Sequence, residues 1–246
     1  MAGVNPVLVV FGYALVTALA TGLGAVPFAF VREVSPRAVA YANALAAGLM
    51  LGASFRLGEE GTAYGGVPTL LGATGGVMFI WGTQRWLSGR EVAFGATAGL
   101  AARQAILIVV VMTVHSFAEG VAVGVAFGGG TTLALAITLA IAVHNIPEGL
   151  AITAVLRPRG VIGVLRCAGW SVLSSLPQPI MAVPAFLLVD TFRLALPYGL
   201  GFAAGAMVFM VFVELLPEAL NAARRPAVAL LVSLTMVAMV LFQRHL

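Results

Sequence analysis

The sequence predicts an all-α, polytopic membrane protein, a bundle of eight transmembrane helices with both termini outside the cytoplasm. Composition is the first observation: 61% of the 246 residues are hydrophobic, 9% are charged, and the mean hydropathy is +1.07. A soluble domain has about a quarter of its residues charged, so that class is excluded. The second observation is the recurrence of apolar stretches of about 20 residues, the length that spans a bilayer. The third is a one-sided distribution of arginines.

The apolar stretches are separated by short polar interruptions, which set the ends of the predicted spans. The first stretch lacks a preceding basic region and is too long for a signal peptide, so it counts as a span. Gly128, Gly129 and Gly130 join the fourth and fifth spans by a tight turn, which predicts antiparallel neighbours. No linker divides the chain, so residues 1–246 form one predicted transmembrane domain. The spans are 6–30, 38–57, 66–86, 103–128, 131–156, 161–189, 197–220 and 226–243.

The arginines account for every basic residue except the histidines, because the chain has no lysine. Basic residues stay on the cytoplasmic side of a membrane, so their distribution predicts topology, and the net charge of +4 is no sign of nucleic-acid binding. The single cysteine, Cys167, permits no internal disulfide. Ten arginines follow odd-numbered spans (Arg32, Arg37, Arg85, Arg90, Arg103, Arg157, Arg159, Arg166, Arg224, Arg225), and three lie on the other side (Arg56, Arg193, Arg244).

Residues 115–149 carry the chemistry of the chain. His115 and Glu119 lie four residues apart in the fourth span, and His144 and Glu148 do so in the fifth. Residues i and i+4 share one face of a helix, so each span presents an imidazole and a carboxylate together. Counted from the glycine turn at 1.5 Å per residue, the two histidines fall at nearly equal depth, close to the middle of the bilayer.

Two carboxylates at this depth need a partner, because each costs about 2.5–3.5 kcal/mol on insertion scales. No lysine or arginine lies beside Glu119 or Glu148, so a divalent cation is the natural partner. Imidazole and carboxylate ligands suit Zn²⁺ first, then Fe²⁺ or Mn²⁺. The alternative is a pair of structural hydrogen bonds between helices. Two pairs at matched depth favour the metal site over that alternative.

Three further residues have both a functional and a structural interpretation. Pro147 leaves the carbonyl of Val143 without its usual donor, which either opens a polar cavity or only kinks the helix. Met50 offers a thioether to a metal pathway or simply packs. The functional interpretation of Glu214 is a role in metal entry or exit, and the structural one is a glutamate near a helix end whose side chain reaches water.

The two motifs, HSFAEGVAVG from His115 and HNIPEGLAI from His144, resemble the paired metal-binding helices of the ZIP (Zrt/Irt-like) transporters, and the chain is closest to the bacterial branch. Further segments that resemble the family are AAGLMLGASF at 46–55, SSLPQP at 174–179 and GAMVFMVFVELLPEAL at 205–220. The resemblance implies a transport site made by His115, Glu119 and Glu148 with His144 in or beside it. It also implies an elevator-like cycle in which spans one, four, five and six slide against the others.

The chain departs from family members that hold a second, adjacent metal. Ser116, Asn145 and Gln178 stand where those members have an asparagine, an acid and a glutamate, and Val213 replaces a histidine before Glu214. We therefore expect one metal site, with the three neutral residues as supporting polar contacts. Residues 87–102 contain no histidine, so no histidine-rich metal-sensing loop is expected there.

The predicted function is uptake of a divalent transition metal into the cytoplasm, with Zn²⁺ as the cargo and Fe²⁺, Mn²⁺ and Cd²⁺ as alternatives. No prosthetic group is expected. The predicted location is the bacterial inner membrane, with the lipid bilayer as partner, no nucleic acid, and a homodimer left open. The competing hypothesis is an intramembrane zinc-dependent hydrolase that uses the same ligands; the absence of an HExxH motif speaks against it. A receptor-like protein with a fixed metal ranks third.

Overall fold

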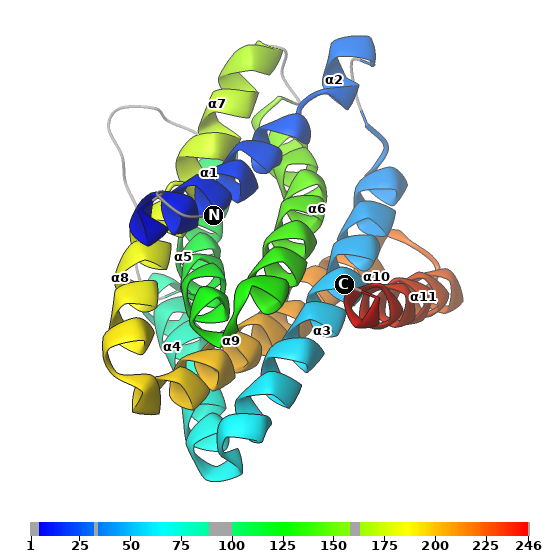
Figure 1. Ribbon diagram of the computed structural model, residues 1–246. Helices are drawn as coiled ribbons and strands as arrows, with labels where there is room; N and C mark the ends of the chain where they lie inside the picture. The colour runs from blue at the N-terminus through cyan, green and yellow to red at the C-terminus, as the bar shows by residue number, and fades with distance from the viewer. Residues whose placement is uncertain (1–4, 32–33, 89–99, 158–162, 246) are drawn as a thin grey trace.

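The structure is a computed structural model that describes residues 5–31, 34–88, 100–157 and 163–245 (Figure 1). The described residues form helices and short connections and no strand, which confirms the predicted all-α class. The helices are α1 (Pro6–Leu23), α2 (Pro27–Phe30), α3 (Pro36–Tyr64), α4 (Gly66–Ser88), α5 (Leu100–Gly129), α6 (Thr131–Leu156), α7 (Val164–Ser175), α8 (Pro177–Thr191), η1 (Arg193–Ala195), α9 (Leu196–Met210), η2 (Val211–Leu215), α10 (Leu216–Ala222) and α11 (Arg225–Arg244).

The eight predicted spans map onto these helices. Six stretches among the described residues are long and apolar enough to cross a membrane: 6–30, 36–64, 131–156, 164–191, 193–222 and 225–244. Helices α4 and α5, of 23 and 30 residues, supply the other two, so the count of eight fits. Three spans are broken rather than straight. The first turns between α1 and α2, the sixth breaks at Leu176 before a proline, and the seventh contains the π-helix η2.

The starts of the helices follow from local sequence. Asn5 caps α1 by accepting a hydrogen bond from the Val7 N–H at 2.9 Å, and Ser35 caps α3 by accepting from Ala38 at 3.2 Å. Each cap precedes a proline, whose fixed φ and missing N–H suit the first helical position. Both helices therefore begin where a side chain replaces the missing intrahelical partner.

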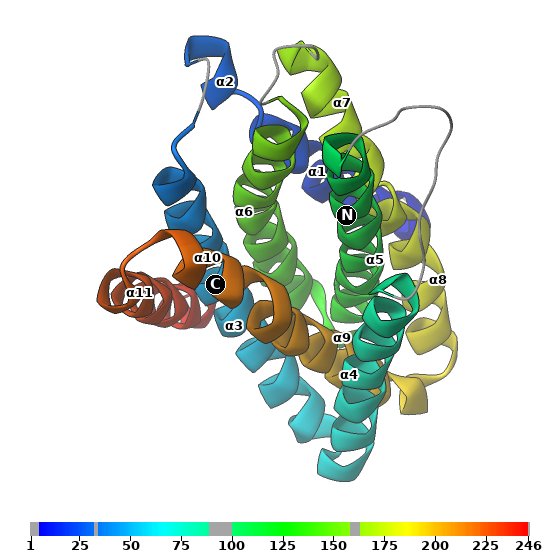
Figure 2. The same ribbon diagram turned by 180° about the vertical axis from the view of Figure 1, so that it is seen from behind.

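The helices form two groups that meet at α5 and α6. One group contains α1, α5, α6, α7 and α8, and the other contains α3, α4, α9, α10 and α11. Helix α1 crosses one side of α5 and α6 (Figure 1), and α9 crosses the opposite side (Figure 2). Because α5 and α6 lie between these two layers, their facing side chains are removed from solvent and lipid.

Glycines let helix backbones touch within each group. A Cβ added at Gly149 in α6 would lie 1.7 Å from the carbonyl oxygen of Thr21 in α1. One added at Gly205 in α9 would lie 2.2 Å from the carbonyl oxygen of Ala73 in α4. Only a residue without a side chain fits such approaches, which are typical of helix packing in membranes. Each group is therefore tied by backbone-to-backbone contact.

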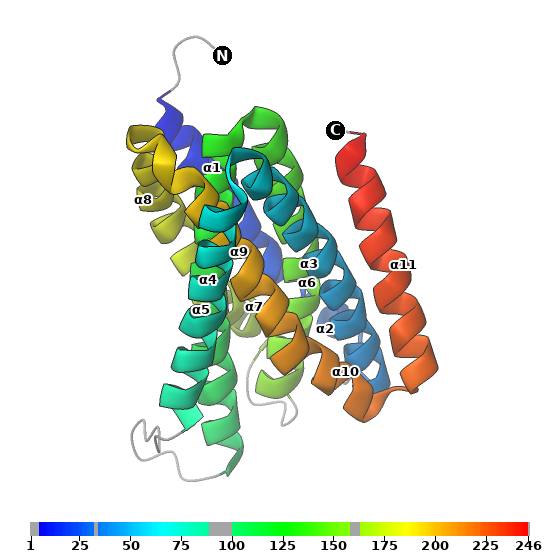
Figure 3. The same ribbon diagram turned by 90° about the horizontal axis from the view of Figure 1, so that it is seen from below.

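The two ends of the bundle differ in which helix ends, and which arginines, lie there. The start of α1 and the end of α11 lie at the same end, as an even number of crossings requires (Figure 3). Helix α6 ends at Leu156, followed by its cap Arg157, and α11 begins after Arg224, both at the opposite end (Figure 3). The end of α8, which precedes Arg193 in the chain, and the end of α11 at Arg244 lie at the end that holds the termini (Figure 3). Arg32, Arg90 and Arg159 lie outside the described residues.

Candidate metal site

The four residues of the paired motifs converge between α5 and α6. His115, Glu119, His144 and Glu148 all lie in the interior, with at most 2% of their surface exposed. Helix α6 continues through Pro147 without a break, and that residue is buried as well. The cavity predicted at the carbonyl of Val143 therefore stays a prediction, and the polar interior is built by the side chains.

His144 and Glu119 form the tightest pair, and it joins two helices rather than one. The Nε2 atom of His144 lies 2.6 Å from Oε1 of Glu119, and its Nδ1 atom lies 3.2 Å from the carbonyl oxygen of Ala140. The main-chain carbonyl can only accept, so Nδ1–H donates to it, and Nε2 and the Glu119 oxygen share one further proton between them. The Glu119 side of this pair therefore holds a proton where a cation would bind.

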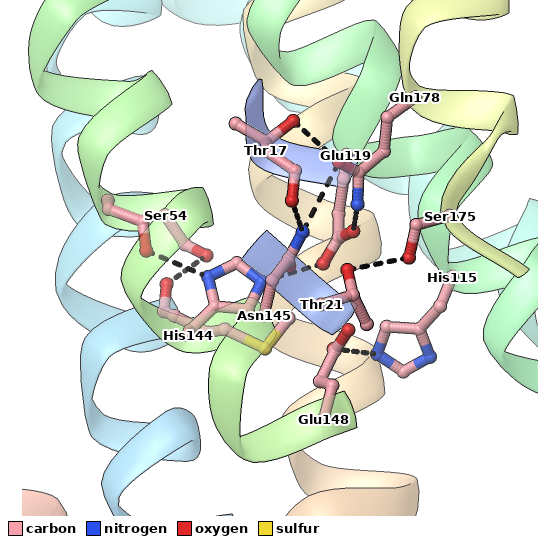
Figure 4. A network of polar contacts seen from close by, with 12 residues as sticks. Thr17, Thr21, Ser54, His115, Glu119, His144, Asn145, Glu148, Ser175 and Gln178 are labelled. Carbon is pink, nitrogen blue, oxygen red and sulfur yellow. Dashed lines mark hydrogen bonds and ion pairs between the residues drawn. The ribbon is translucent and has the colours of Figure 1, made fainter. Parts of the chain in front are cut away.

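His115 lies between two carboxylates that come from different elements. Its Nδ1 atom is 3.0 Å from Oε2 of Glu214. Its Nε2 atom is 3.8 Å from Oε1 of Glu148 (Figure 4). Gln84 of α4 donates to Oε1 of Glu214 at 2.9 Å. Glu214 lies in the π-helix η2, a geometry often found at functional sites. A small cavity of ≈ 10 Å³, about enough for one water, lies beside His115 and Glu214.

The arrangement fits a divalent cation. One ligand atom each from Glu119, His144 and Glu148 lies within 4.8 Å of the others. A tetrahedral Zn²⁺ with bonds of about 2.0–2.2 Å needs its ligand atoms roughly 3.3 Å apart, so small side-chain movements would complete the site. The buried atoms that lack a hydrogen-bond partner include Nε2 of His115, Oδ1 of Asn145 and Oε1 of Glu148. Each can offer a lone pair, which a cation would satisfy.

The predicted supporting residues differ in their surroundings. Asn145 and Gln178 are fully buried and bond to each other at 3.2 Å, and Gln178 also donates to Oε2 of Glu119 at 2.5 Å (Figure 4). Ser116 is buried in α5, directly after His115. Met50 of α3 is fully buried in the apolar core of the bundle, and its main-chain carbonyl accepts a hydrogen bond from the Ser54 hydroxyl. Met50 therefore stays a candidate without a described contact to the ligands.

Two threonines of α1 take part in this network although the sequence did not single them out. Thr17 contacts Asn145 and Gln178, and Thr21 lies 2.8 Å from the hydroxyl of Ser175. Their spacing of four residues in an apolar span was the available signal, since it places both hydroxyls on one face. Recognising them required knowing that this face of α1 lies against α6 and α8.

Comparisons with known proteins show which proteins the chain resembles. The family model described as "ZIP Zinc transporter" matches residues 90–242, more than half of the chain. The chain is 46% identical over 221 residues to the "Putative zinc transporter At3g08650" of Arabidopsis thaliana, covering 88% of this chain and 35% of that protein. It is 32% identical over 221 residues to the "Zinc transporter GufA" of Myxococcus xanthus, covering 83% of this chain and 85% of that protein. The chain thus spans about a third of the plant relative and most of the bacterial one.

Proposed function

The chain belongs to the ZIP zinc transporter family, and we propose that it carries a divalent transition-metal ion, Zn²⁺ before Fe²⁺, Mn²⁺ or Cd²⁺, into the cytoplasm by alternating access. The observation that supports this most is the buried cluster of Glu119, His144 and Glu148 inside a bundle of apolar helices. Ionisable groups in such a place are expensive and mark ion pathways. Both named relatives are called zinc transporters, which favours zinc as the cargo.

Within this proposal the site holds one metal. Glu119, His144 and Glu148 would bind it, and His115 would join once it turns from Glu214. Asn145 and Gln178 bond mainly to other protein groups, which leaves fewer atoms for a second cation. A mixed nitrogen and oxygen set without thiolate suits Zn²⁺ that must also be released.

The two helix groups supply the moving parts of an elevator-like cycle. The group with α1, α5, α6, α7 and α8 carries the three proposed ligands, and Glu214 belongs to the other group. Glycines join backbones within each group, whereas at the boundary the nearest atoms to a Cβ added at Gly199 of α9 belong to the side chains of Val125 in α5 and Val189 in α8. Side-chain contacts can exchange during sliding more easily than interlocked backbones. The His115–Glu214 pair crosses this boundary, so it would separate during the cycle.

The chain is a multi-pass membrane protein, and its finer placement is part of the proposal. We place it in the bacterial inner membrane as one transmembrane domain, with both termini on the non-cytoplasmic side. The arginine bias supports that orientation, because the end of α6, capped by Arg157, and the start of α11, capped by Arg224, lie opposite the termini. Family membership makes the chain a transporter and not an enzyme, so the hydrolase alternative is not retained.

Metal uptake into liposomes tests the proposal. Purified protein is reconstituted around a zinc indicator, and wild type is compared with Glu119→Gln and Glu148→Gln. The wild type should fill the vesicles, and both variants should transport at background rates because each loses a carboxylate ligand. Glu59→Gln, the same change at an exposed residue outside the cluster, is the matched control and should transport normally. If the wild type moves none of Zn²⁺, Fe²⁺, Mn²⁺ or Cd²⁺ under any gradient, the proposal fails.

A further inference from the structure

A groove of ≈ 270 Å³ lies between α3 and α11, far from the metal site. Its lining comes from one residue of α3 and five residues of α11: Phe55, Met236, Val237, Val240, Leu241 and Arg244. The residues of α11 recur at one-turn spacing, so they form one strip of the helix about 12 Å long. Every lining residue except Arg244 is apolar, and Arg244 belongs to the last turn of α11. The groove is therefore an apolar channel with a cation at one end.

The groove begins where the glycines of α3 end. A Cβ added at Gly48 would collide with Oγ1 of Thr235, and one added at Gly52 would lie 2.7 Å from Cβ of Met239. About one turn beyond Gly52 stands Phe55, whose side chain is half exposed. Glycines let two helices approach closely and a phenyl ring does not, so α11 separates from α3 toward the end that holds the termini (Figure 3). The space between them is built by the sequence of α3.

Two polar side chains at this end of α11 have no partner in the described part of the chain. Arg56 of α3 pairs with Glu59 at 3.2 Å and with Glu60 at 3.5 Å, whereas the ion pairs between described residues do not include Arg244. Gln243 is 5% exposed, and neither its Nε2 nor its Oε1 atom has a hydrogen-bond partner there. A buried amide without partners is costly, and such a group calls for an explanation. A ligand that accepts hydrogen bonds would supply one.

We propose that this groove binds one glycerophospholipid, with an acyl chain along α11 and the phosphate on Arg244. The guanidinium group presents a planar fork of donors that matches a phosphate. The amide of Gln243, one residue earlier, donates to an ester oxygen of the same lipid. The apolar strip of α11 takes the chain, because burial of apolar surface there removes no polar group from water. A phospholipid thus brings the acceptors and the apolar chain that the two halves of the groove require.

Lipid binding to delipidated protein tests the proposal. Purified protein in detergent is titrated with phosphatidylglycerol, and bound lipid is counted by native mass spectrometry. Wild type should bind one lipid tightly, and diacylglycerol with the same acyl chains but no phosphate should bind about tenfold more weakly. Arg244→Gln should weaken phosphatidylglycerol binding by a similar factor and leave diacylglycerol binding unchanged. Arg225→Gln, the same change at the other end of α11, should bind like wild type.

A second pair of variants tests the apolar part of the groove and leaves Arg244 in place. Val240→Trp fills the groove and should weaken the binding of both lipids. Leu230→Trp, at an exposed residue of α11 outside the groove, should change neither.

Three results would overturn the inference. The first is equal phosphatidylglycerol binding by wild type and Arg244→Gln. The second is an equal loss in Arg225→Gln, which would mean that the lipid responds to charge anywhere on α11. The third is a dimer in lipid-free detergent that Val240→Trp dissociates, which would assign the groove to a second copy of the chain.

Discussion

At the scale of a single residue, the two ring nitrogens of His144 decide how the ring is oriented and where a proton lies in the metal site. Its Nδ1 atom donates to the carbonyl of Ala140, and its Nε2 atom shares a proton with the carboxyl group of Glu119. The carbonyl orients the ring, as a hydrogen bond to the second nitrogen commonly does for histidines that bind metal. The proton between Nε2 and Glu119 lies where a metal must enter, since 2.6 Å is too short to hold an ion between the two atoms.

Zinc binding should therefore release about one proton from this pair, since ligand atoms must lose their protons to coordinate. Isothermal titration calorimetry in two buffers of different ionisation enthalpy measures the proton count directly. His144→Gln should lower both the proton count and the zinc affinity, the latter by more than the roughly 10–100-fold that loss of a supporting partner costs. His245→Gln, at the end of α11, is the control. Equal heats in the two buffers for wild type would contradict the shared proton.

At the scale of elements, the contact between α1 and α6 places the polar side chains of α1 at the site. Gly24 and Gly149 let the two backbones meet, and a Cβ at Gly24 would lie 2.2 Å from the Leu150 nitrogen. The main-chain oxygen of Thr17 reaches Asn145 only because α1 lies this close. Small residues at this crossing therefore act on the metal site although neither glycine is a ligand.

Gly149→Ala should move α1 away from α6 and lengthen the Thr17–Asn145 bond. Overpacking of this kind costs about 1–3 kcal/mol, so the unfolding temperature and the zinc affinity should both fall. Gly12→Ala is the matched control, because a Cβ there meets nothing within 4 Å. Thermal unfolding in detergent and zinc titration measure the two effects. If both variants behave like wild type, the glycine contact does not position α1.

At the scale of the molecule, one aromatic side chain contacts both groups of helices: it packs on a ring of the other group and on a ring of its own group. Phe79 of α4 lies 5.1 Å, ring centroid to centroid, from Phe117 of α5 in the other group. The same ring lies 5.6 Å from Phe202 of α9 in its own group. Phe79 thus makes one ring contact between the two groups and one within its own group, and the two centroid distances are similar.

Cross-linking these pairs tests the sliding motion. In a Cys167→Ala background, cysteine pairs at positions 79 and 117 or at 79 and 202 are joined by a short bifunctional thiol reagent. The link between groups should abolish zinc uptake into liposomes, and the link within one group should leave it near the unlinked rate. Reduction of a cleavable linker should restore uptake. Normal uptake with the first pair fully linked would exclude relative motion of the two groups.

The orientation of the whole bundle is tested by labelling from one side. In the same background, Glu59→Cys in α3 should react with a membrane-impermeant maleimide added to intact bacterial spheroplasts. Arg225→Cys, at the start of α11, should react only after the membrane is opened, because arginine-rich ends stay cytoplasmic. The reverse pattern would place the termini in the cytoplasm.

The sequence by itself determined the helical membrane class, the approximate places of the spans and the four ionisable candidates between His115 and Glu148. These follow from local properties, namely long apolar runs and charged residues inside them. Only the tertiary structure decided that the close pairs join different helices, that Glu214 reaches His115, and that Thr17 contacts Gln178. Such contacts join residues up to 161 positions apart, and helical spacing predicts faces but not which faces meet.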